Sequence, residues 1–172
     1  MNYNKILYRG LSPWTGRNPK ILILGTIPSL ESFNNKKYYI NTSNNSFWEI
    51  MSHLFCENLT PDSKIQLTNK GIALWDCLSE CYKQNKNNSD NAIIRSSAHP
   101  VDLEDFLKKH PTIKYIFLNG FGKRKGTLYW FEKFFKNLNQ KYITLPNTSN
   151  SYARISKIEK ISEWRHLLDY LR

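Results

Sequence analysis

The sequence is short of the residues that build metal sites and disulfide frameworks. Its 172 residues include three cysteines and four histidines, and no two cysteines form a Cys-x-x-Cys pair. An odd, unpaired set of cysteines is not typical of a secreted disulfide scaffold, and three thiolates do not complete a four-thiolate iron–sulfur site. The histidines show no metal-ligand spacing either. We therefore expect a protein without a bound metal.

Long apolar runs and glycine-rich phosphate loops are also absent from the sequence. No run approaches the roughly 18 apolar residues that a membrane span requires, and residues 1–9 lack the apolar segment of a signal peptide. No Gly-x-Gly-x-x-Gly or Walker lysine motif follows an apolar run, which argues against a dinucleotide enzyme. We expect a cytoplasmic protein with no membrane partner.

Acidic residues are scarce relative to basic ones. Lys and Arg number 25 against 14 Asp and Glu, so the formal net charge is +11. Clustered positive charge gains affinity for phosphates by releasing their counterions, which favours a nucleic-acid partner. The alternative is a merely solvated surface, because Lys and Asn are abundant throughout. The length fits one domain, residues 1–172.

Apolar runs alternate with helical periodicities along the chain. Short apolar runs bounded by turn residues predict four strands, at residues 20–24, 71–75, 113–118 and 142–145. Apolar residues at helical spacing predict helices at residues 46–55, 101–110, 127–138 and 156–171. Residues 1–19 read as a polar lead-in, and residues 82–91 as a mobile surface loop. The alternation predicts an α/β fold, a three-layer α/β/α sandwich around a four-stranded parallel sheet.

Each predicted strand ends in a polar or glycine-containing stretch. In chain order these are Gly25 to Ser29, Asp76, Asn119-Gly120 and Pro146 to Ser149. Parallel strands bring their carboxyl ends to one edge of the sheet, and ligands bind beyond that edge. Groups far apart in sequence are therefore expected to meet in one cleft.

Six short stretches carry a resemblance to a known family. They are Gly25-Thr26-Ile27-Pro28-Ser29, Tyr38-Tyr39, Asn45-Ser46-Phe47-Trp48, Gly71-Ile72-Ala73-Leu74-Trp75-Asp76, Phe117-Leu118-Asn119-Gly120 and Leu145-Pro146-Asn147-Thr148-Ser149. Their order and spacing resemble the uracil-DNA glycosylase superfamily, most closely its hypoxanthine-DNA glycosylase branch. The resemblance spans residues 20 to 155 approximately.

The resemblance implies a monofunctional DNA glycosylase of base excision repair. Such an enzyme flips a deaminated base, hypoxanthine or uracil, out of DNA and hydrolyses its N-glycosidic bond without metal or cofactor. Damaged DNA would be the partner, and the protein would act as a monomer. Two alternatives stay open: a uracil-specific glycosylase, and a non-catalytic α/β domain that binds nucleic acid.

Two residues are implied to carry the reaction. Phe47 matches the aromatic that stacks on the flipped base, although helical core packing would also explain it. Asn45 matches the side chain that holds a water beneath the sugar, although it could equally cap a helix. Asn41 and Asn44 are alternatives, because the spacing from Tyr39 to Phe47 is slightly longer than is usual in the branch.

Two positions depart from the wider superfamily. Ile27 stands where many members carry an Asp or Asn that activates water, an absence shared with the hypoxanthine branch. Leu145 stands where uracil-specific members carry a His that stabilises the leaving base. Backbone amides of residues 26–29 or 147–149 would have to take over that role.

Asp76 is implied to recognise the base, because a carboxylate accepts the ring N–H that deamination creates. A structural turn aspartate is the alternative. Asn119 is expected to hold loops together rather than to touch substrate. The residues that would line the base site or contact DNA are Gly25, Thr26, Ile27, Pro28, Ser29, Tyr39, Asn147, Thr148 and Ser149. The residues that would contact phosphates before the third helix are Lys123, Arg124 and Lys125.

Overall fold

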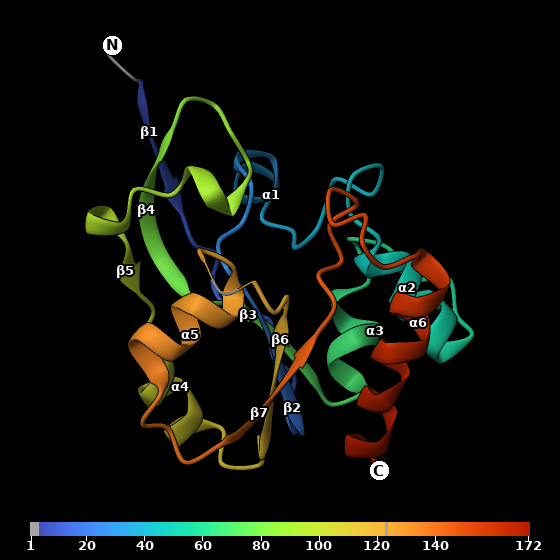
Figure 1. The fold of residues 1–172 in the computed structure, drawn as a ribbon. Coiled ribbons are helices and arrows are strands. Elements are labelled where there is room, and N and C mark those ends of the chain that lie inside the picture. Colours follow the sequence, from blue (N-terminus) through green and yellow to red (C-terminus); the bar gives the residue numbers. More distant parts are fainter. Residues whose placement is uncertain (1–3, 123) are drawn as a thin grey trace.

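The centre of the computed structural model, which describes residues 4–122 and 124–172, is a parallel sheet (Figure 1). Its strands lie in the order β3-β2-β6-β7, with bounds Ile21–Gly25 for β2, Ile72–Asp76 for β3, Tyr115–Asn119 for β6 and Lys141–Leu145 for β7. The register places Gly25 beside Asp76 and Asn119 beside Leu145. The predicted four-stranded parallel sheet is confirmed.

The sheet is covered on both faces, which explains why its central strand reads as a continuous apolar run. Every residue of β2 is buried. Ile21 and Ile23 pack into the cluster that includes Phe47 and Trp164, whereas Leu22 and Leu24 pack into the cluster that includes Phe131. Burial on both faces leaves no position for the polar alternation of a half-exposed strand.

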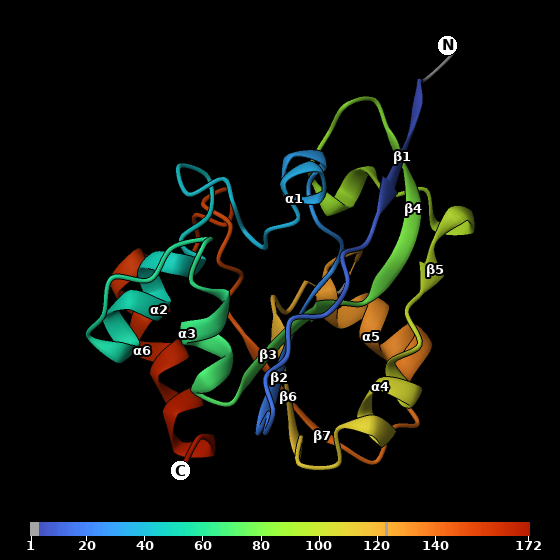
Figure 2. The same cartoon turned by 180° about the vertical axis from the view of Figure 1, so that it is seen from behind.

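Helices form the outer layers. On one face lie α2 (Phe47–Phe55), α3 (Lys64–Asn69) and α6 (Lys157–Trp164), and on the other lie α4 (Leu103–Lys109) and α5 (Thr127–Phe135) (Figures 1 and 2). The short α1 (Leu30–Asn35) follows β2. The predicted sandwich is confirmed, although α5 ends three residues early and α6 passes into a 3-10 helix at Arg165–Tyr170.

A second, antiparallel sheet was not predicted. It has the order β1-β4-β5, from β1 (Lys5–Arg9), β4 (Leu78–Gln84) and β5 (His99–Pro100). The prediction of a surface loop at residues 82–91 was wrong for its beginning, because β4 continues through Gln84 and buries Lys83. A lysine at an inward position breaks the alternation that would have marked the strand. Two 3-10 helices follow, at Asp90–Ala92 and Arg95–Ser97.

Two negative findings concern the residues that the structure describes. None of their helices has the length and apolar character needed to cross a bilayer. Nowhere among them do three or more His, Cys, Asp or Glu side chains lie close enough together to hold a metal ion.

Candidate active site

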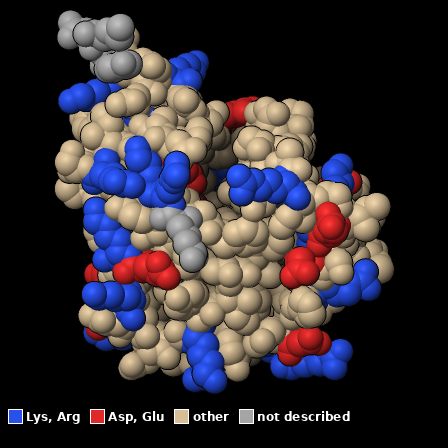
Figure 3. Space-filling view, in the orientation of Figure 1, with Lys and Arg blue, Asp and Glu red and all other residues tan. Residues whose placement is uncertain are grey.

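The carboxyl ends of the parallel strands meet at one edge of the sheet, as the topology requires. Gly25, Asp76 and Asn119 are the last residues of β2, β3 and β6. In the orientation of Figure 1, the surface is hollowed between the part that carries α1 and the part that carries α2 and α6 (Figure 3). Lys and Arg side chains gather on both sides of this hollow.

Asn119 joins the ends of three segments, as its sequence context predicted. Its side-chain amide donates to Thr148 Oγ1 at 2.9 Å, and its Oδ1 accepts the backbone N–H of Thr148 at 3.0 Å. Its backbone carbonyl accepts from Thr127 Oγ1, which in turn bonds Thr26 Oγ1 at 3.0 Å. The next residue, Gly120, has φ +120°, and a Cβ there would lie 3.1 Å from the Asn147 amide. Buried bonds on both sides of one amide hold these loops in a fixed arrangement.

The loop after β7 also pairs with the segment before α2. Asn45 and Ser149 form an antiparallel bridge, Ser46 N donates to the Thr148 carbonyl at 2.8 Å, and Asn150 N donates to the Asn44 carbonyl at 2.9 Å. Lys160 is buried on α6, and its ammonium donates to the Ser149 carbonyl at 2.9 Å. Segments about a hundred residues apart therefore form one unit beside the strand ends.

Asn45 lies half-buried at the start of α2, and its Oδ1 accepts the backbone N–H of Phe47 at 2.9 Å. The N-cap residue of α2 is Ser46, so Asn45 lies one residue before the cap and closes a turn onto the first N–H of the helix. A side-chain amide oxygen has two lone pairs, so one acceptor position remains after this bond, and the amide is already oriented.

The two alternative asparagines lie differently. Asn41 Oδ1 accepts from Ser43 Oγ at 2.7 Å and from Asn44 N at 3.3 Å, which closes a local turn. Asn44 is exposed and contributes its backbone carbonyl to the bridge with residue 150. Of the three amides, that of Asn45 is the one held against α2 and the loop after β7.

Phe47 is fully buried, and Tyr39 covers it. The two rings are stacked with centroids 4.2 Å apart and an interplanar angle of 24°. Trp48 and Trp164 pack edge-on against Phe47, at 5.1 and 6.0 Å. Trp48 donates its indole N–H to the Tyr38 carbonyl at 2.9 Å, as befits a core residue.

Asp76 is 3% exposed, and its Oδ2 has no hydrogen-bond partner. A Cβ on Gly25 would clash with the other carboxylate oxygen and would lie 3.1 Å from Tyr39 Oη, so glycine is required for this close approach. Burial, followed by the charge of Asp90, raises the pKa of Asp76 to about 8, against the opposing charge of Lys83. The carboxyl is therefore mainly protonated at neutral pH, which the sequence did not indicate.

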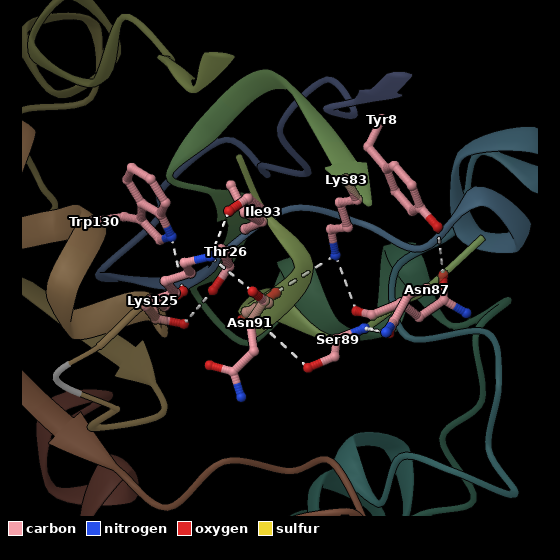
Figure 4. A network of polar contacts seen from close by, with 12 residues as sticks. Tyr8, Thr26, Lys83, Asn87, Ser89, Asn91, Ile93, Lys125 and Trp130 are labelled. Atoms are coloured by element: carbon pink, nitrogen blue, oxygen red, sulfur yellow. Dashed lines mark hydrogen bonds and ion pairs between the residues drawn. The ribbon is translucent and has the colours of Figure 1, made fainter. Parts of the chain in front are cut away.

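The two charged groups that act on this carboxyl, Lys83 and Asp90, belong to a polar network that the sequence did not indicate. Figure 4 shows this network around Lys83. The buried ammonium of Lys83 donates to the Asn88 carbonyl at 2.9 Å and lies 3.7 Å from Asp90. Burial lowers the pKa of Lys83 and raises that of Asp90, whereas a hydrogen bond from Thr26 lowers the pKa of Asp90. A single lysine that breaks strand alternation was the only available signal for this network.

The remaining residues of the loop after β2 are mostly structural. Thr26, Ile27 and Pro28 are buried, and Ile27 packs into the core with α4 and α5. The hydroxyl of Ser29 accepts the Ser32 N–H at 3.1 Å and so caps α1. Leu145 is also a core residue.

The three basic residues before α5, at positions 123–125, do not share one role. Lys123 lies outside the described residues, and Arg124 is exposed. The ammonium of Lys125 donates to the carbonyls of Asn91 and Ile93, both at 2.7 Å, and its own carbonyl accepts from Trp130 at 2.8 Å (Figure 4). Lys125 therefore anchors the turn before α5 to the 3-10 helix at Asp90–Ala92.

Known proteins are similar to this chain in sequence and in fold. The chain is 30% identical over 166 residues to a hypoxanthine DNA glycosylase of Methanosarcina acetivorans, covering 92% of this chain and 96% of the relative. A solution NMR structure from the same organism, described as a candidate uracil DNA glycosylase, superposes with a TM-score of 0.75 at 27% identity. That match covers 96% of this chain and 99% of the other. No family model matches the chain.

Proposed function

Because the chain belongs to the hypoxanthine-DNA glycosylase family of the uracil-DNA glycosylase superfamily, we propose that it excises hypoxanthine and uracil from DNA. The reaction is hydrolysis of the N-glycosidic bond of a base flipped out of the helix, a step of base excision repair. Extrusion is necessary because the sugar carbon under attack is inaccessible while the base is stacked.

The observation that carries the proposal is the unpartnered oxygen of Asp76 at the end of β3. A buried polar atom without a partner is costly, about 1–3 kcal/mol, so a ligand that supplies the bond gains that amount. A protonated carboxyl donates one hydrogen bond and accepts another. Hypoxanthine and uracil both present an adjacent ring N–H and carbonyl, which match this pair.

Asn45 would position the attacking water. With one lone pair of Oδ1 held by Phe47 N–H, the other accepts a hydrogen bond from the water and turns the water oxygen toward the anomeric carbon. The bond from that carbon to the base nitrogen breaks and its electron pair leaves with the base. The water oxygen forms the new bond, and the proton that the water loses passes through solvent to neutralise the departing base. An amide is too weak a base to remove the proton early, which suits a dissociative cleavage.

The departing base needs stabilisation. Leu145 offers no polar group, and the amides of Thr148 and Ser149 already donate to Asn119 and Asn147 side chains. We therefore assign this role to backbone N–H groups of the loop at residues 26–29, in which only Pro28 has none.

The test uses duplexes that each carry one uracil, hypoxanthine or xanthine, followed by alkali to cleave abasic sites. Excision of both hypoxanthine and uracil supports the proposal. Excision of uracil alone would make the protein a uracil-specific glycosylase. Tight binding to these duplexes with no abasic sites formed would leave the non-catalytic alternative.

A further inference from the structure

The place where a flipped base would stack is occupied by a side chain of the protein itself. Tyr39 lies flat on Phe47 at 4.2 Å, which is ordinary stacking distance and leaves no room for a base between the rings. Trp48 and Trp164 lie nearly perpendicular to the same phenylalanine, which is fully buried. Phe47 therefore has no face open to a substrate.

The polar end of Tyr39 also lies where the recognised edge of a base would be. Its hydroxyl is buried without a partner, beside Gly25 and the carboxyl whose Oδ2 is equally unpartnered. Burial raises the pKa of Tyr39, as does Asp76, while the nearby side chain of Asn119 lowers it without meeting the geometry of a hydrogen bond to the hydroxyl. The phenol fills the site by shape but leaves both polar atoms unsatisfied, which a native interior rarely tolerates.

The backbone that carries Tyr39 is held in an unfavourable conformation. Tyr39 has φ +54°, as has Lys36 three residues earlier, in the left-handed region that non-glycine residues seldom adopt. Directly after it, the turn from Asn41 to Asn44 is largely exposed. Local strain of this kind, next to a polar site, is typical of segments that change conformation in function.

We propose that Tyr39 is a specificity-determining residue that occupies the base site in the DNA-free protein and leaves it when a base enters. The inference rests on the proposed function. An entering base must replace the stacking that Tyr39 gives Phe47, which every base can do. Only a base whose edge also bonds Asp76 gains more than the phenol did, so displacement selects a base complementary to that carboxyl.

The direct test follows the Tyr39 ring by NMR in protein with isotope-labelled tyrosine, the signal being assigned with Tyr39→Phe. Stacking on Phe47 shifts the ring protons upfield in the free protein. A duplex with a hydrolysis-resistant deoxyinosine analogue should move the signal to the position of an unstacked tyrosine, and an undamaged duplex should not. A signal that stays upfield with the analogue bound, or moves with both duplexes, overturns the proposal.

Two variants give an independent readout. Tyr39→Phe keeps the ring but removes the unpartnered hydroxyl, so it should raise the melting temperature and slow hypoxanthine excision about tenfold. Tyr39→Ala empties the site and should lower the ratio of hypoxanthine to adenine excision about tenfold. Tyr38→Phe is the matched control, since its hydroxyl donates to the Ser12 carbonyl outside the site.

Failure of this inference differs from failure of the proposed function. If the wild-type protein excises no base, the proposed function is wrong whatever Tyr39 does. If the wild type excises hypoxanthine while Tyr39→Phe and Tyr39→Ala both retain its rate and selectivity, only the role of Tyr39 is wrong.

Discussion

At the scale of single residues, Asn45 combines a turn that bonds the first N–H of α2 with the water-holding role that we propose for it. Replacing it with Ala removes both, and the loss of that hydrogen bond alone costs about 0.5–1.5 kcal/mol of stability. Serine can also close a turn of this kind but is too short to present an amide oxygen to the water. The two roles can therefore be separated by substitution.

We expect Asn45→Ala and Asn45→Ser to reduce single-turnover excision about a hundredfold or more, with binding to damaged DNA changed only a few fold. The interaction is made mainly in the transition state. Asn41→Ala, which opens only a local turn, should lose much less. Rates are normalised to folded protein; if Asn45→Ser kept most of the activity, the turn onto α2 rather than the water would be the important role.

Asp76 should make stability depend on pH. Its folded pKa of about 8 lies above the ordinary value of 3.8, so the folded protein binds the proton more tightly than the unfolded chain. The free energy of unfolding should therefore fall as the pH rises from about 4 to about 8, by at most about 1.4 kcal/mol per unit. Asp90, with its raised pKa, acts in the same direction, whereas burial lowers the pKa of Lys83, which acts in the opposite direction.

Asp76→Asn removes the titrating group. The free energy of unfolding, measured with denaturant at each pH, should therefore change less between about pH 4 and about pH 8 in this variant than in wild type. The same pH dependence in both proteins would contradict the raised pKa.

Ionisation of Asp76 should also change base selectivity, because the protonated carboxyl can donate to the ring nitrogen of adenine and the carboxylate cannot. The ratio of hypoxanthine to adenine excision should therefore rise above about pH 8 in the wild type only.

At the scale of elements, β4 places a lysine near the site without making it available for chemistry. The Lys83 side chain is 1% exposed, paired with Asp90 and bonded to the Asn88 carbonyl. A Schiff base would need that amine to reach the sugar, out of a network that bonds it on two sides.

We therefore expect borohydride to trap no covalent adduct between the protein and an excised duplex, because hydrolysis by water forms no imine. The strand should stay intact until alkali is added. A trapped adduct that disappeared in Lys83→Gln would show that the β4 lysine takes part in the reaction, and one that persisted would point to another amine.

The elements differ in how well the sequence predicted them, and the differences have physical causes. The parallel strands were predictable because burial on both faces selects unbroken apolar runs, as in Ile21–Gly25. Strand β4 was not, because Lys83 is satisfied by Asp90 and a carbonyl that approach from a segment without periodicity. The convergence of Gly25, Asp76 and Asn119 could be predicted from the parallel topology alone. The stacking of Tyr39 on Phe47 could not be predicted, because it depends on a left-handed backbone conformation that the residue types do not indicate.

At the scale of the whole molecule, the net charge of +11 should appear in the salt dependence of DNA binding. Each phosphate contact contributes a slope of about −0.9 to log K against log salt concentration. Arg124 is exposed, whereas the ammonium of Lys125 is bonded to two carbonyls. The two neighbours should therefore respond differently to substitution.

We expect Arg124→Ala to make the salt slope shallower by about one unit without changing the melting temperature. Lys125→Ala should lower the melting temperature. Lys108→Ala is the control, because Lys108 pairs with Glu104 on α4, on the lower side of the view in Figure 1, away from the strand ends. If the slope of log K against log salt concentration were equal in all three variants and wild type, DNA would bind to a surface that does not include Arg124.

The bridge between Asn45 and Ser149 has a consequence for how such chains can evolve. Because Ser46 and Asn150 extend the pairing on either side, the position of Asn45 is set by its partner across the bridge, not by its distance along the chain from Tyr39. Residues gained or lost in the exposed turn at 41–44 are absorbed as a longer or shorter bulge. Drift in the length of that turn can therefore accumulate without carrying the amide away from its place.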